Sequence, residues 1–433
     1  MSFLKDAKKI LGGSSSGGGG RQAGMLIALV AIVILFQILT SGTTLSPENL
    51  INLTSRYSYI LILAIGMVMV IIAGHIDLSV GSVAALTGIV VALSMRDWNF
   101  PWWAAILLGL VVGAIIGAWQ GFWVAYVGIP AFIVTLAGMM LFRGMNQWIG
   151  RSTAVTVPED YQWISDGYLP EVGPNTGYNN LTLLIGLVIT LIVVIREVMN
   201  RRTNVKLGAE VAPIWVVVVR LALFGVVIMG AAMLFASGRV GTSIPASGLI
   251  LGVLAVLYTF ITKNTPFGRH VYAVGGNSRA ASLSGVNIKR VNFFVMMNMS
   301  ILAALAGMIF VARSNASGPQ DGLNWELDAI ASVFIGGAAV SGGIGTVAGA
   351  LIGGLVMAVL SNGLVLLGVG SDQVQVIKGL VLLAAVAFDV YNKNRGRFSL
   401  IGLLTKKPAN TGDDQPTGAS TEAQKPQPAG NAG

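Results

Sequence analysis

The sequence predicts an all-α polytopic membrane protein, and three observations lead to that prediction. Hydrophobic residues make up 54% of the 433 residues and charged residues only 10%, whereas a soluble domain carries about 25% charged residues. The mean hydropathy is +0.76. The apolar residues are also grouped into long runs that short polar segments separate, so lipid is the solvent for most of the chain.

Twelve apolar runs provide the predicted helices. They cover residues 25–40, 57–73, 78–93, 102–127, 129–149, 181–195, 212–236, 244–262, 291–311, 327–340, 346–367 and 374–390. Several are shorter than the ~20 residues of a perpendicular span and suit tilted, re-entrant or buried helices. We therefore expect about twelve transmembrane helices. No A-x-A site follows the first run, so we interpret it as a retained span rather than a signal peptide.

The basic residues give the expected topology. If the amino terminus lies inside, the basic segments 196–206 and 263–290 and the tail after Tyr391 all fall inside, as the positive-inside rule requires. The acidic loop 159–171 falls outside. We therefore interpret the net charge of +9 as a topology signal, not a nucleic-acid signal, and expect both termini in the cytoplasm.

Composition also sets the expected domains and excludes several chemistries. Residues 1–24 read as a flexible basic segment, residues 25–395 as the membrane domain, and residues 396–433 as a disordered tail rich in Pro, Gln, Thr, Gly and Ala. The chain has no cysteine, which excludes disulfides and thiol chemistry. With only two histidines, we expect no metal site and no cofactor.

The stretch Ala73–Gly88, AGHIDLSVGSVAALTG, places His75 and Asp77 between two apolar runs. A carboxylate at the centre of a membrane helix costs about 3 kcal/mol, so Asp77 should face protein, water or a membrane boundary. Two interpretations stay open. Asp77 caps a helix starting at Leu78 in a tight turn at the cytoplasmic mouth, or the stretch is a broken helix that lines a solute path.

Two helices carry a glycine at every fourth position. The first ladder is Gly109, Gly113, Gly117 and Gly121, and the second is Gly345, Gly349 and Gly353. Each ladder predicts a flat face where another backbone packs closely. Asp77 precedes the first ladder from the inside and Asp328 the second from the outside, as in an inverted repeat with a solute path between the halves.

The loop of residues 267–290 predicts a short cytoplasmic helix. Asn277 or Ser278 can cap it, Ala280, Ala281 and Leu283 give it a small apolar face, and Gly285 can end it. Such a helix is either a membrane-surface element or a docking knob, in which Ala281 would pack against a partner. Basic inside loops are also common in membrane proteins generally.

Three motifs in order resemble those of ATP-binding-cassette (ABC) importer permease subunits, over roughly residues 25–395. The segment from Arg279 to Gly285 is similar to the E-A-A-x-x-x-G coupling loop, with Arg279 in the place of Glu. GHIDLSVGS resembles the signature G-G-I-D-L-S-V-G-S of the ribose/xylose branch, and ELDAIA around Asp328 resembles its second-half signature. His75 replaces a Gly, as in xylose and multiple-monosaccharide permeases. Residues 181–236 look like a helical pair added to the more compact relatives.

The resemblance implies a type II ABC importer-like fold and a subunit that carries monosaccharides, xylose or several sugars, across the bacterial inner membrane. It also implies a homodimer in membrane lipid, bound to ATP-binding subunits and fed by a periplasmic sugar-binding protein. The chain has no G-x-x-x-x-G-K-[ST] loop, so a partner would hydrolyse the ATP and this chain would not be an enzyme. The implied coupling residues are Asn277, Ala280, Ala281, Ser284 and Gly285, and the implied motif residues are His75, Asp77, Ser79, Gly81 and Asp328.

Polar side chains inside the apolar runs are the candidate cargo contacts, because a sugar offers both hydroxyls and an apolar ring face. They are Gln120, Thr135, Asn146, Asn298 and Asn362, with Trp119 and Gln375 beside them. The alternative for each is a hydrogen bond between helices, worth ~0.6 kcal/mol.

Other functions compete with sugar import. The same fold could carry nucleosides, autoinducer-type furanoses or branched-chain amino acids. An ion-coupled secondary transporter also uses inverted repeats and predicts acids paired deep in the membrane, whereas Asp77, Asp328 and Asp389 read as span ends. Arg143 and Lys378 lie within runs, where both can snorkel. A membrane enzyme lacks any nucleophile, base or metal constellation here.

Overall fold

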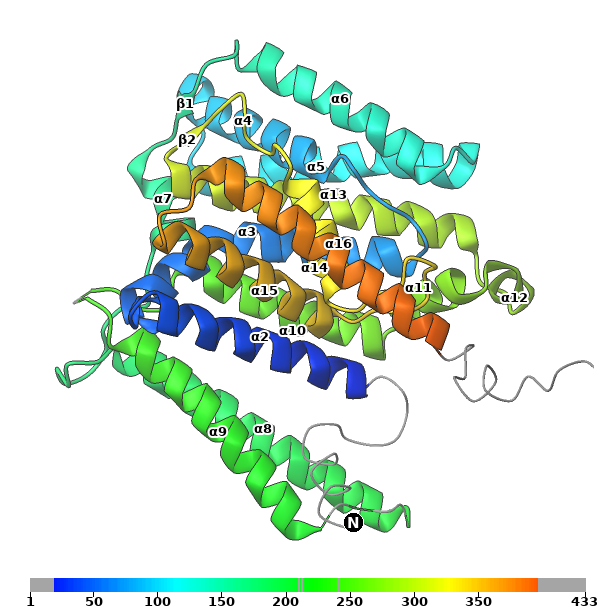
Figure 1. Ribbon diagram of the computed structural model, residues 1–433. Helices are drawn as coiled ribbons and strands as arrows, with labels where there is room; N and C mark the ends of the chain where they lie inside the picture. Colours follow the sequence, from blue (N-terminus) through cyan, green and yellow to red (C-terminus); the bar gives the residue numbers. More distant parts are fainter. Residues whose placement is uncertain (1–18, 209–210, 212, 240, 396–433) are drawn as a thin grey trace, which may run out of the picture. The chain divides into compact units, whose positions relative to one another are not determined.

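The computed structural model describes residues 19–208, 211, 213–239 and 241–395, and this part is nearly all helical (Figure 1). The first helices are α2 (Gly19–Leu39), α3 (Pro47–Ile72), α4 (Val80–Trp98), α5 (Trp102–Phe122), α6 (Ala131–Ile149), α7 (Glu159–Asp166), α8 (Asn180–Lys206) and α9 (Ile214–Ala236). They are followed by α10 (Ala246–Asn264), α11 (Pro266–Gly276), α12 (Ser278–Leu283), α13 (Ile288–Ser314), α14 (Trp325–Ile335), α15 (Val347–Leu366) and α16 (Ser371–Arg395). A 3-10 turn (Thr43–Leu45) follows α2, and a π turn (Trp123–Val127) extends α5.

Each of the twelve apolar runs forms a helix, so the all-α prediction is confirmed. Eight of the described helices are long and apolar enough to cross a membrane: α3, α4, α5 with its π turn, α8, α9, α10, α13 and α15. The first helix begins at Gly19, before the expected start of the membrane domain at residue 25. The rest of the expected flexible start, residues 1–18, and the tail 396–433 lie outside the described residues. Contacts divide the chain into residues 1–387 and 388–433, and the architecture below is that of the first unit.

The core is built around α13, which packs against α3, α4 and α5. The first glycine ladder faces this helix. A Cβ at Gly113 would lie 2.6 Å from the Ala304 Cβ, and one at Gly121 would lie 2.8 Å from the Phe293 carbonyl oxygen. The backbones of α5 and α13 therefore touch along the ladder, which confirms the packing interpretation.

The second ladder faces α14 instead. A Cβ at Gly349 would lie 2.3 Å from the carbonyl oxygen of Gly336, and one at Gly353 would lie 2.1 Å from that of Ser332. Small residues at these positions let the short helix α14 lie directly on α15.

A two-stranded sheet joins the two halves of the chain. Strand β1 (Val155–Thr156) pairs antiparallel with β2 (Ala316–Ser317). The buried Tyr161 of α7 donates a hydrogen bond from its hydroxyl to the Met308 carbonyl at 3.2 Å. These contacts fix the loop after α6 beside the loop after α13.

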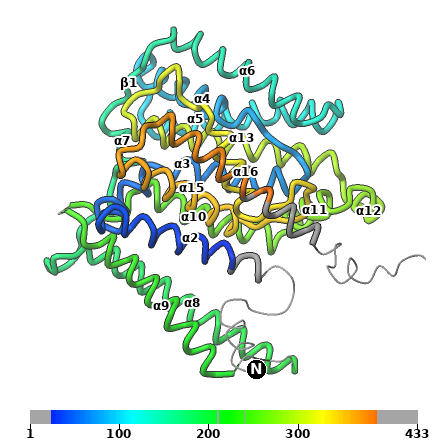
Figure 2. The backbone as a smooth tube through the Cα atoms, in the orientation of Figure 1, coloured from blue at the N-terminus to red at the C-terminus, as the bar shows by residue number. Residues whose placement is uncertain are grey.

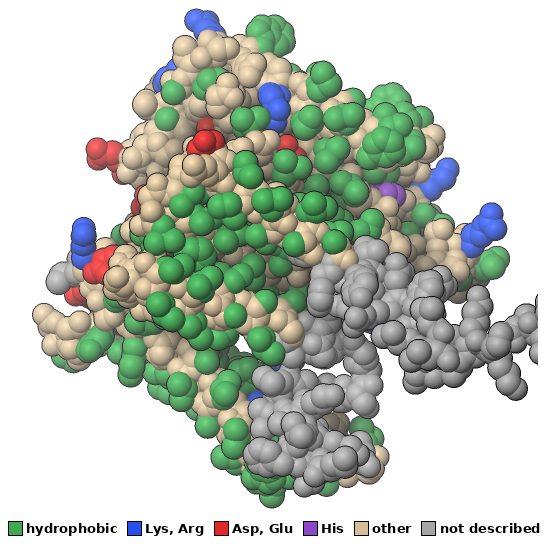
Figure 3. Space-filling model, viewed as in Figure 1, with side chains coloured by type: hydrophobic (Ala, Val, Ile, Leu, Met, Phe, Trp, Pro, Cys, Tyr) green, Lys and Arg blue, Asp and Glu red, His purple; other side chains and the backbone are tan. Residues whose placement is uncertain are grey.

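The predicted added pair forms the helices α8 and α9, which lie side by side in Figures 1 and 2. Both are largely exposed and apolar, and an ion pair between Glu197 and Arg220 joins them. Hydrophobic side chains also cover much of the face drawn in Figure 3, while most of its charged side chains lie toward the edges. Such a surface suits a protein surrounded by lipid.

Candidate functional site

The chain is not helical between α3 and α4. Helix α3 ends at Ile72, Gly74 has a φ of +87°, and α4 begins only at Val80. Asp77 does not cap a helix starting at Leu78, as one interpretation held. Its Oδ1 accepts hydrogen bonds from the Ser79 backbone N–H at 2.8 Å and from the Ser79 hydroxyl at 2.6 Å. The carboxylate therefore fixes the local turn just before α4.

Packing places this break beside the middle of α13. A Cβ at Gly307 would lie 2.1 Å from the Ala84 carbonyl oxygen, and one at Gly88 would lie 2.8 Å from the Val311 side chain. Helices α4 and α13 thus run in the same direction, and Val80 falls beside the central turns of α13 (Ile288–Ser314). A tight turn between two helix ends does not describe this geometry. Residues 73–79 instead return from the end of α3 to the middle of the bundle, as the broken-helix interpretation predicts.

Two predicted cargo contacts, Gln120 and Thr135, converge on this break, and a third, Asn146, lies further along α6. Gln120 of α5 donates from Nε2 to the Ser79 hydroxyl at 2.6 Å, and the Thr135 hydroxyl of α6 donates to the Ile76 carbonyl at 3.3 Å. Further along α6, Asn146 donates from Nδ2 to the Gly318 carbonyl at 3.4 Å. All three side chains are buried. The break is thus lined by polar groups from α5 and α6, and Asn146 contacts the loop before α14 instead.

The other predicted contacts lie elsewhere. Asn298 accepts a short hydrogen bond from the Tyr258 hydroxyl, and Asn362 donates to Asn49 at 3.0 Å. Gln375 is exposed on α16, and Trp119 is an exposed ring that packs edge-on against Trp123 and Phe142. For Asn298 and Asn362, the hydrogen bond between helices is the observed outcome.

Neither of the two motif residues His75 and Asp328 hydrogen-bonds to the polar cluster of Asp77, Ser79 and Gln120. His75 is half-buried and faces Asn292 of α13. Asp328, in the first turn of α14, forms an ion pair with Lys378 of α16. The second-half motif nevertheless reaches the break, because a Cβ at Gly81 would lie 2.7 Å from the Glu326 carboxylate and 2.1 Å from the Gly322 carbonyl oxygen.

The short helix predicted in the loop 267–290 is α12. Asn277 caps it, accepting from the Ala280 N–H at 3.0 Å, and the Ser284 hydroxyl donates back to the Ala280 carbonyl at 3.0 Å. Gly285, at a φ of +85°, ends it. These features match the prediction.

The expected role of Ala281 as a partner contact is wrong. This side chain is only 5% exposed and packs in the protein's own core, whereas Leu283 on the same helix is 91% exposed. A helix of this length exposes only part of its apolar face, and α12 packs against α11 and α13 with the Ala281 side in the core. The residue that projects is therefore Leu283, which belonged to the predicted apolar face but was not singled out.

Helix α11 joins α12 to the break. A Cβ at Gly275 would lie only 1.6 Å from the Ile72 carbonyl oxygen, and the same carbonyl accepts a hydrogen bond from the Gly343 N–H at 2.8 Å. The last residue of α3 is thus held between α11 and the loop after α14. A displacement of α11 must move Ile72 or separate these backbones.

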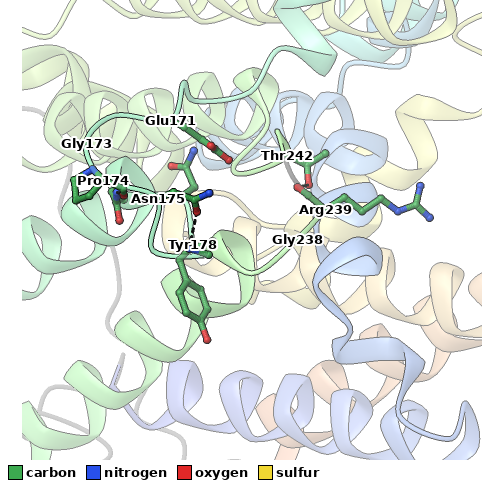
Figure 4. Close-up of a pocket in the computed structure, with 12 residues that line it drawn as sticks. Glu171, Gly173, Pro174, Asn175, Tyr178, Gly238, Arg239 and Thr242 are labelled. Atoms are coloured by element: carbon green, nitrogen blue, oxygen red, sulfur yellow. Dashed lines mark hydrogen bonds between the residues drawn. The ribbon is translucent and has the colours of Figure 1, made fainter.

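A cavity of 110 Å³ lies at the base of the α8–α9 pair (Figure 4). Its wall is made by the loop before α8 and the loop after α9, and includes Glu171, Asn175, Tyr178, Arg239 and Thr242. None of the cargo candidates lines it. Within the described ranges, no group of His, Cys, Asp or Glu is placed to hold a metal ion.

Two charged side chains at the break were not predicted to act there. Glu326 is buried beside Gly81, and Arg143 is half-buried on α6, one turn before Asn146. The signal available in the sequence was an acid and a base inside or beside apolar runs, but Arg143 was interpreted as a snorkelling side chain.

Comparison with known proteins gives consistent matches. Residues 49–386 match the family described as branched-chain amino acid transport system / permease component. The xylose transport system permease protein of Haemophilus influenzae is 40% identical over 376 residues, which cover 86% of this chain and 96% of that relative. The Escherichia coli protein of the same name is 38% identical over 372 residues, 86% of this chain and 92% of the relative. The ribose import permease protein of Haemophilus influenzae is 33% identical over 364 residues, 84% and 92% of the two chains. No solved structure matches the chain significantly.

Proposed function

We propose a function from the premise that this chain belongs to the family of branched-chain amino acid transport system permease components. The chain is a membrane permease subunit of a sugar ABC importer and is not itself an enzyme. Its proposed cargo is a monosaccharide, xylose before others, because its relatives at 38–40% identity are xylose permeases. The observation that carries the proposal is the polar break beside the middle of α13, where Asp77, Ser79 and Gln120 form one buried cluster.

In this proposal the cargo crosses the membrane along the break. A non-helical segment inside a membrane protein exposes backbone polar groups, and these are tolerated only where protein or a water-filled path meets them. Hydroxyl groups of a sugar can exchange hydrogen bonds with such a lining as they lose water. The proposed path residues are Asp77, Ser79, Gly81, Gln120, Thr135 and Asn146.

The proposal includes a topology of about twelve spans, with both termini in the cytoplasm and an inverted repeat centred on the path. The basic loops of the sequence support this orientation. It also places the protein in the bacterial inner membrane, where a homodimer would receive sugar from a periplasmic binding protein.

Coupling to ATP hydrolysis would pass through α12. We propose that the exposed Leu283 docks into an ATP-binding subunit and that Ala281 anchors α12 to its own membrane domain. A movement of α12 and α11 would reach Ile72 through the contact at Gly275 and would then shift the break that begins at Ala73. The other coupling residues, Asn277, Ala280, Ser284 and Gly285, would shape the helix rather than bind the partner.

Reconstitution tests the proposal. Proteoliposomes that hold this chain, its ATP-binding subunit and its sugar-binding protein should accumulate xylose only when ATP is present. Xylose uptake by this chain alone, driven by a proton or sodium gradient, would contradict it. That result would favour the ion-coupled alternative and would direct attention to the Asp328–Lys378 pair.

A further inference from the structure

Several buried polar atoms around the break have no hydrogen-bond partner among the described residues. They include Asp77 Oδ2, Gln120 Oε1, Asn146 Oδ1, Glu326 Oε2 and Arg143 Nη2, besides His75 Nε2 and Ser82 Oγ. The first four belong to side chains that are at most 5% exposed. Leaving a buried polar atom unpaired costs about 1–3 kcal/mol, and more when the group is charged. Asp77, Gln120 and Glu326 lie at the break and the first turn of α4, and Arg143 and Asn146 lie further along α6. So many unpaired atoms in one part of the bundle indicate that something other than the protein satisfies them.

Glu326, from the second half of the chain, lies beside Gly81 at the start of α4. Gly81, on the first turn of α4, lacks the Cβ that would stand 2.7 Å from the Glu326 carboxylate. The loop before α14 also approaches Gly81 so closely that a Cβ at Gly322 would lie 2.0 Å from the Gly81 carbonyl oxygen. The two motifs GHIDLSVGS and ELDAIA, far apart in the sequence, thus meet at Gly81.

Arg143 of α6 is the positively charged side chain of the proposed set. Arg143 acts on the Glu326 carboxylate by attraction, and Asp77 acts on it by repulsion. Yet the described residues form no ion pair between Arg143 and Glu326. Because Arg143 Nη2 and Glu326 Oε2 are buried and each lacks a partner among the described residues, both leave hydrogen-bonding positions for a third group.

We propose that Glu326, Arg143 and the open atoms of Asp77, Gln120 and Asn146 form a binding site for a neutral polyhydroxylated ligand. Four of the five open atoms accept hydrogen bonds and one donates. A sugar supplies mainly O–H donors, which match this set, and Arg143 takes the acceptor lone pairs of one hydroxyl or of the ring oxygen. With two carboxylates and one guanidinium, the site disfavours anions such as sugar acids. The inference rests on the proposed sugar import and adds the residues that bind the sugar.

The test is a binding measurement on the purified full-length chain without its binding protein. A ligand that binds only the folded state raises the melting temperature as its concentration rises. We expect D-xylose to stabilise the wild-type protein, and xylonate or leucine to do so much less. Glu326→Gln should need about tenfold more xylose for the same shift, since it loses one charge-assisted hydrogen bond. Arg143→Lys is the second variant, to be used if Glu326→Gln does not fold. It keeps the positive charge but loses the planar guanidinium, and it should show a similar loss of xylose affinity.

Glu197→Gln is the matched control, because it removes another partly buried membrane carboxylate, paired with Arg220 on the α8–α9 pair. It should respond to xylose as the wild-type protein does. Unchanged xylose responses of Glu326→Gln and Arg143→Lys would overturn the site, as would stabilisation of the wild type by leucine but not by xylose. Xylose transport by the complete importer without stabilisation of this chain would overturn the site and leave the proposed function standing. If xylose stabilises the wild-type chain but not Glu326→Gln, while the complete importer transports no xylose, the site would stand and the proposed function would be overturned.

Discussion

Helices α3 and α8 are similarly apolar, yet they lie in opposite surroundings. The most apolar window of α3 has a mean hydropathy of 1.9 and is 83% buried, whereas that of α8 has a mean hydropathy of 2.4 and is 11% buried. In lipid, hydropathy reports that a helix can enter the membrane and does not report whether protein or lipid covers it. Burial follows instead from small and polar residues, such as the glycines that admit α13 and the polar groups that follow α3.

The packed region and the outer pair α8–α9 also differ in how their charged side chains are paired. Around the break after α3, Arg143 and Asp77 both act electrostatically on Glu326, and the described residues show no ion pair among these three. On the outer pair α8–α9, Glu197 and Arg220 neutralise each other. Paired charges need no further partner, whereas unpaired ones need a ligand or water. We therefore assign cargo chemistry to the packed region and regard α8–α9 as an attachment that faces lipid.

The largest expected effect comes from filling the packed region. Gly113→Leu should abolish recovery of a folded, monodisperse permease, because its Cβ alone would lie 2.6 Å from Ala304. Gly230→Leu on α9 is the control, since no atom lies within 4 Å of its Cβ position, and it should be recovered normally. Size-exclusion chromatography in detergent measures both. A Gly113→Leu protein with normal yield but altered sugar preference would place the first ladder on the path.

A smaller but specific effect is expected at the joint between α11 and α3. Gly275→Ala should reduce sugar uptake at least about tenfold while ATP hydrolysis continues, because the added Cβ would lie 1.6 Å from the Ile72 carbonyl oxygen. The neighbouring Gly276→Ala meets no atom within 4 Å and should transport normally. Parallel assays of hydrolysis and uptake compare them. Equal uptake by both variants would exclude this route of coupling.

Leu283→Ser should weaken docking of the ATP-binding subunit by about 1–2 kcal/mol, the scale of one buried leucine side chain. The permease should stay folded, because Leu283 is 91% exposed. Co-purification of the ATP-binding subunit is the measurement. Neutralising Arg279, Lys289 and Arg290 together should cost less, since exposed charges are screened by salt. The opposite order would mean that charge, not the apolar tip, makes the contact.

The smallest effect is expected on the outer pair. The double variant Glu197→Gln, Arg220→Gln should leave xylose uptake unchanged within about twofold, because the ion pair lies on the largely exposed helices α8 and α9 and neutralises itself. Uptake in whole proteoliposomes is the measurement. A severe loss of transport from a stably inserted variant would show that α8–α9 takes part in the path.

Much of the fold could be predicted from local patterns. Apolar runs gave the helices, glycines at every fourth residue gave the close contacts, and Asn277 and Gly285 gave the two ends of α12, because each of these features depends on nearby residues only. The choice among polar residues could not be predicted. Gln120 reaches the break while Asn298 reaches Tyr258, and only the packing of distant helices decides which neighbour each meets.

The site shows the same limit. The sequence allows Asp77 at a helix end or in a broken helix, and the start of α4 at Val80 and the contacts of α4 with α13 at Ala84 and Gly88 distinguish the two. Glu326 was read as part of a motif without a role, since its position beside Gly81 depends on contacts between segments more than two hundred residues apart. Ala281 and Leu283 are neighbours on one short helix, and the packing of that helix against α11 and α13 decides which of the two is exposed.

Asp77→Asn tests the central claim most directly, because it removes one charge at the break and keeps the size of the side chain. Membrane insertion and complex assembly should be normal, while ATP-driven xylose uptake should fall about tenfold or more, the loss expected when a hydrogen bond to a charged group is weakened. Glu197→Gln, assayed beside it, should keep wild-type uptake. Normal xylose uptake by Asp77→Asn would contradict the account, because the carboxylate at the break would then have only a structural role in the turn before α4.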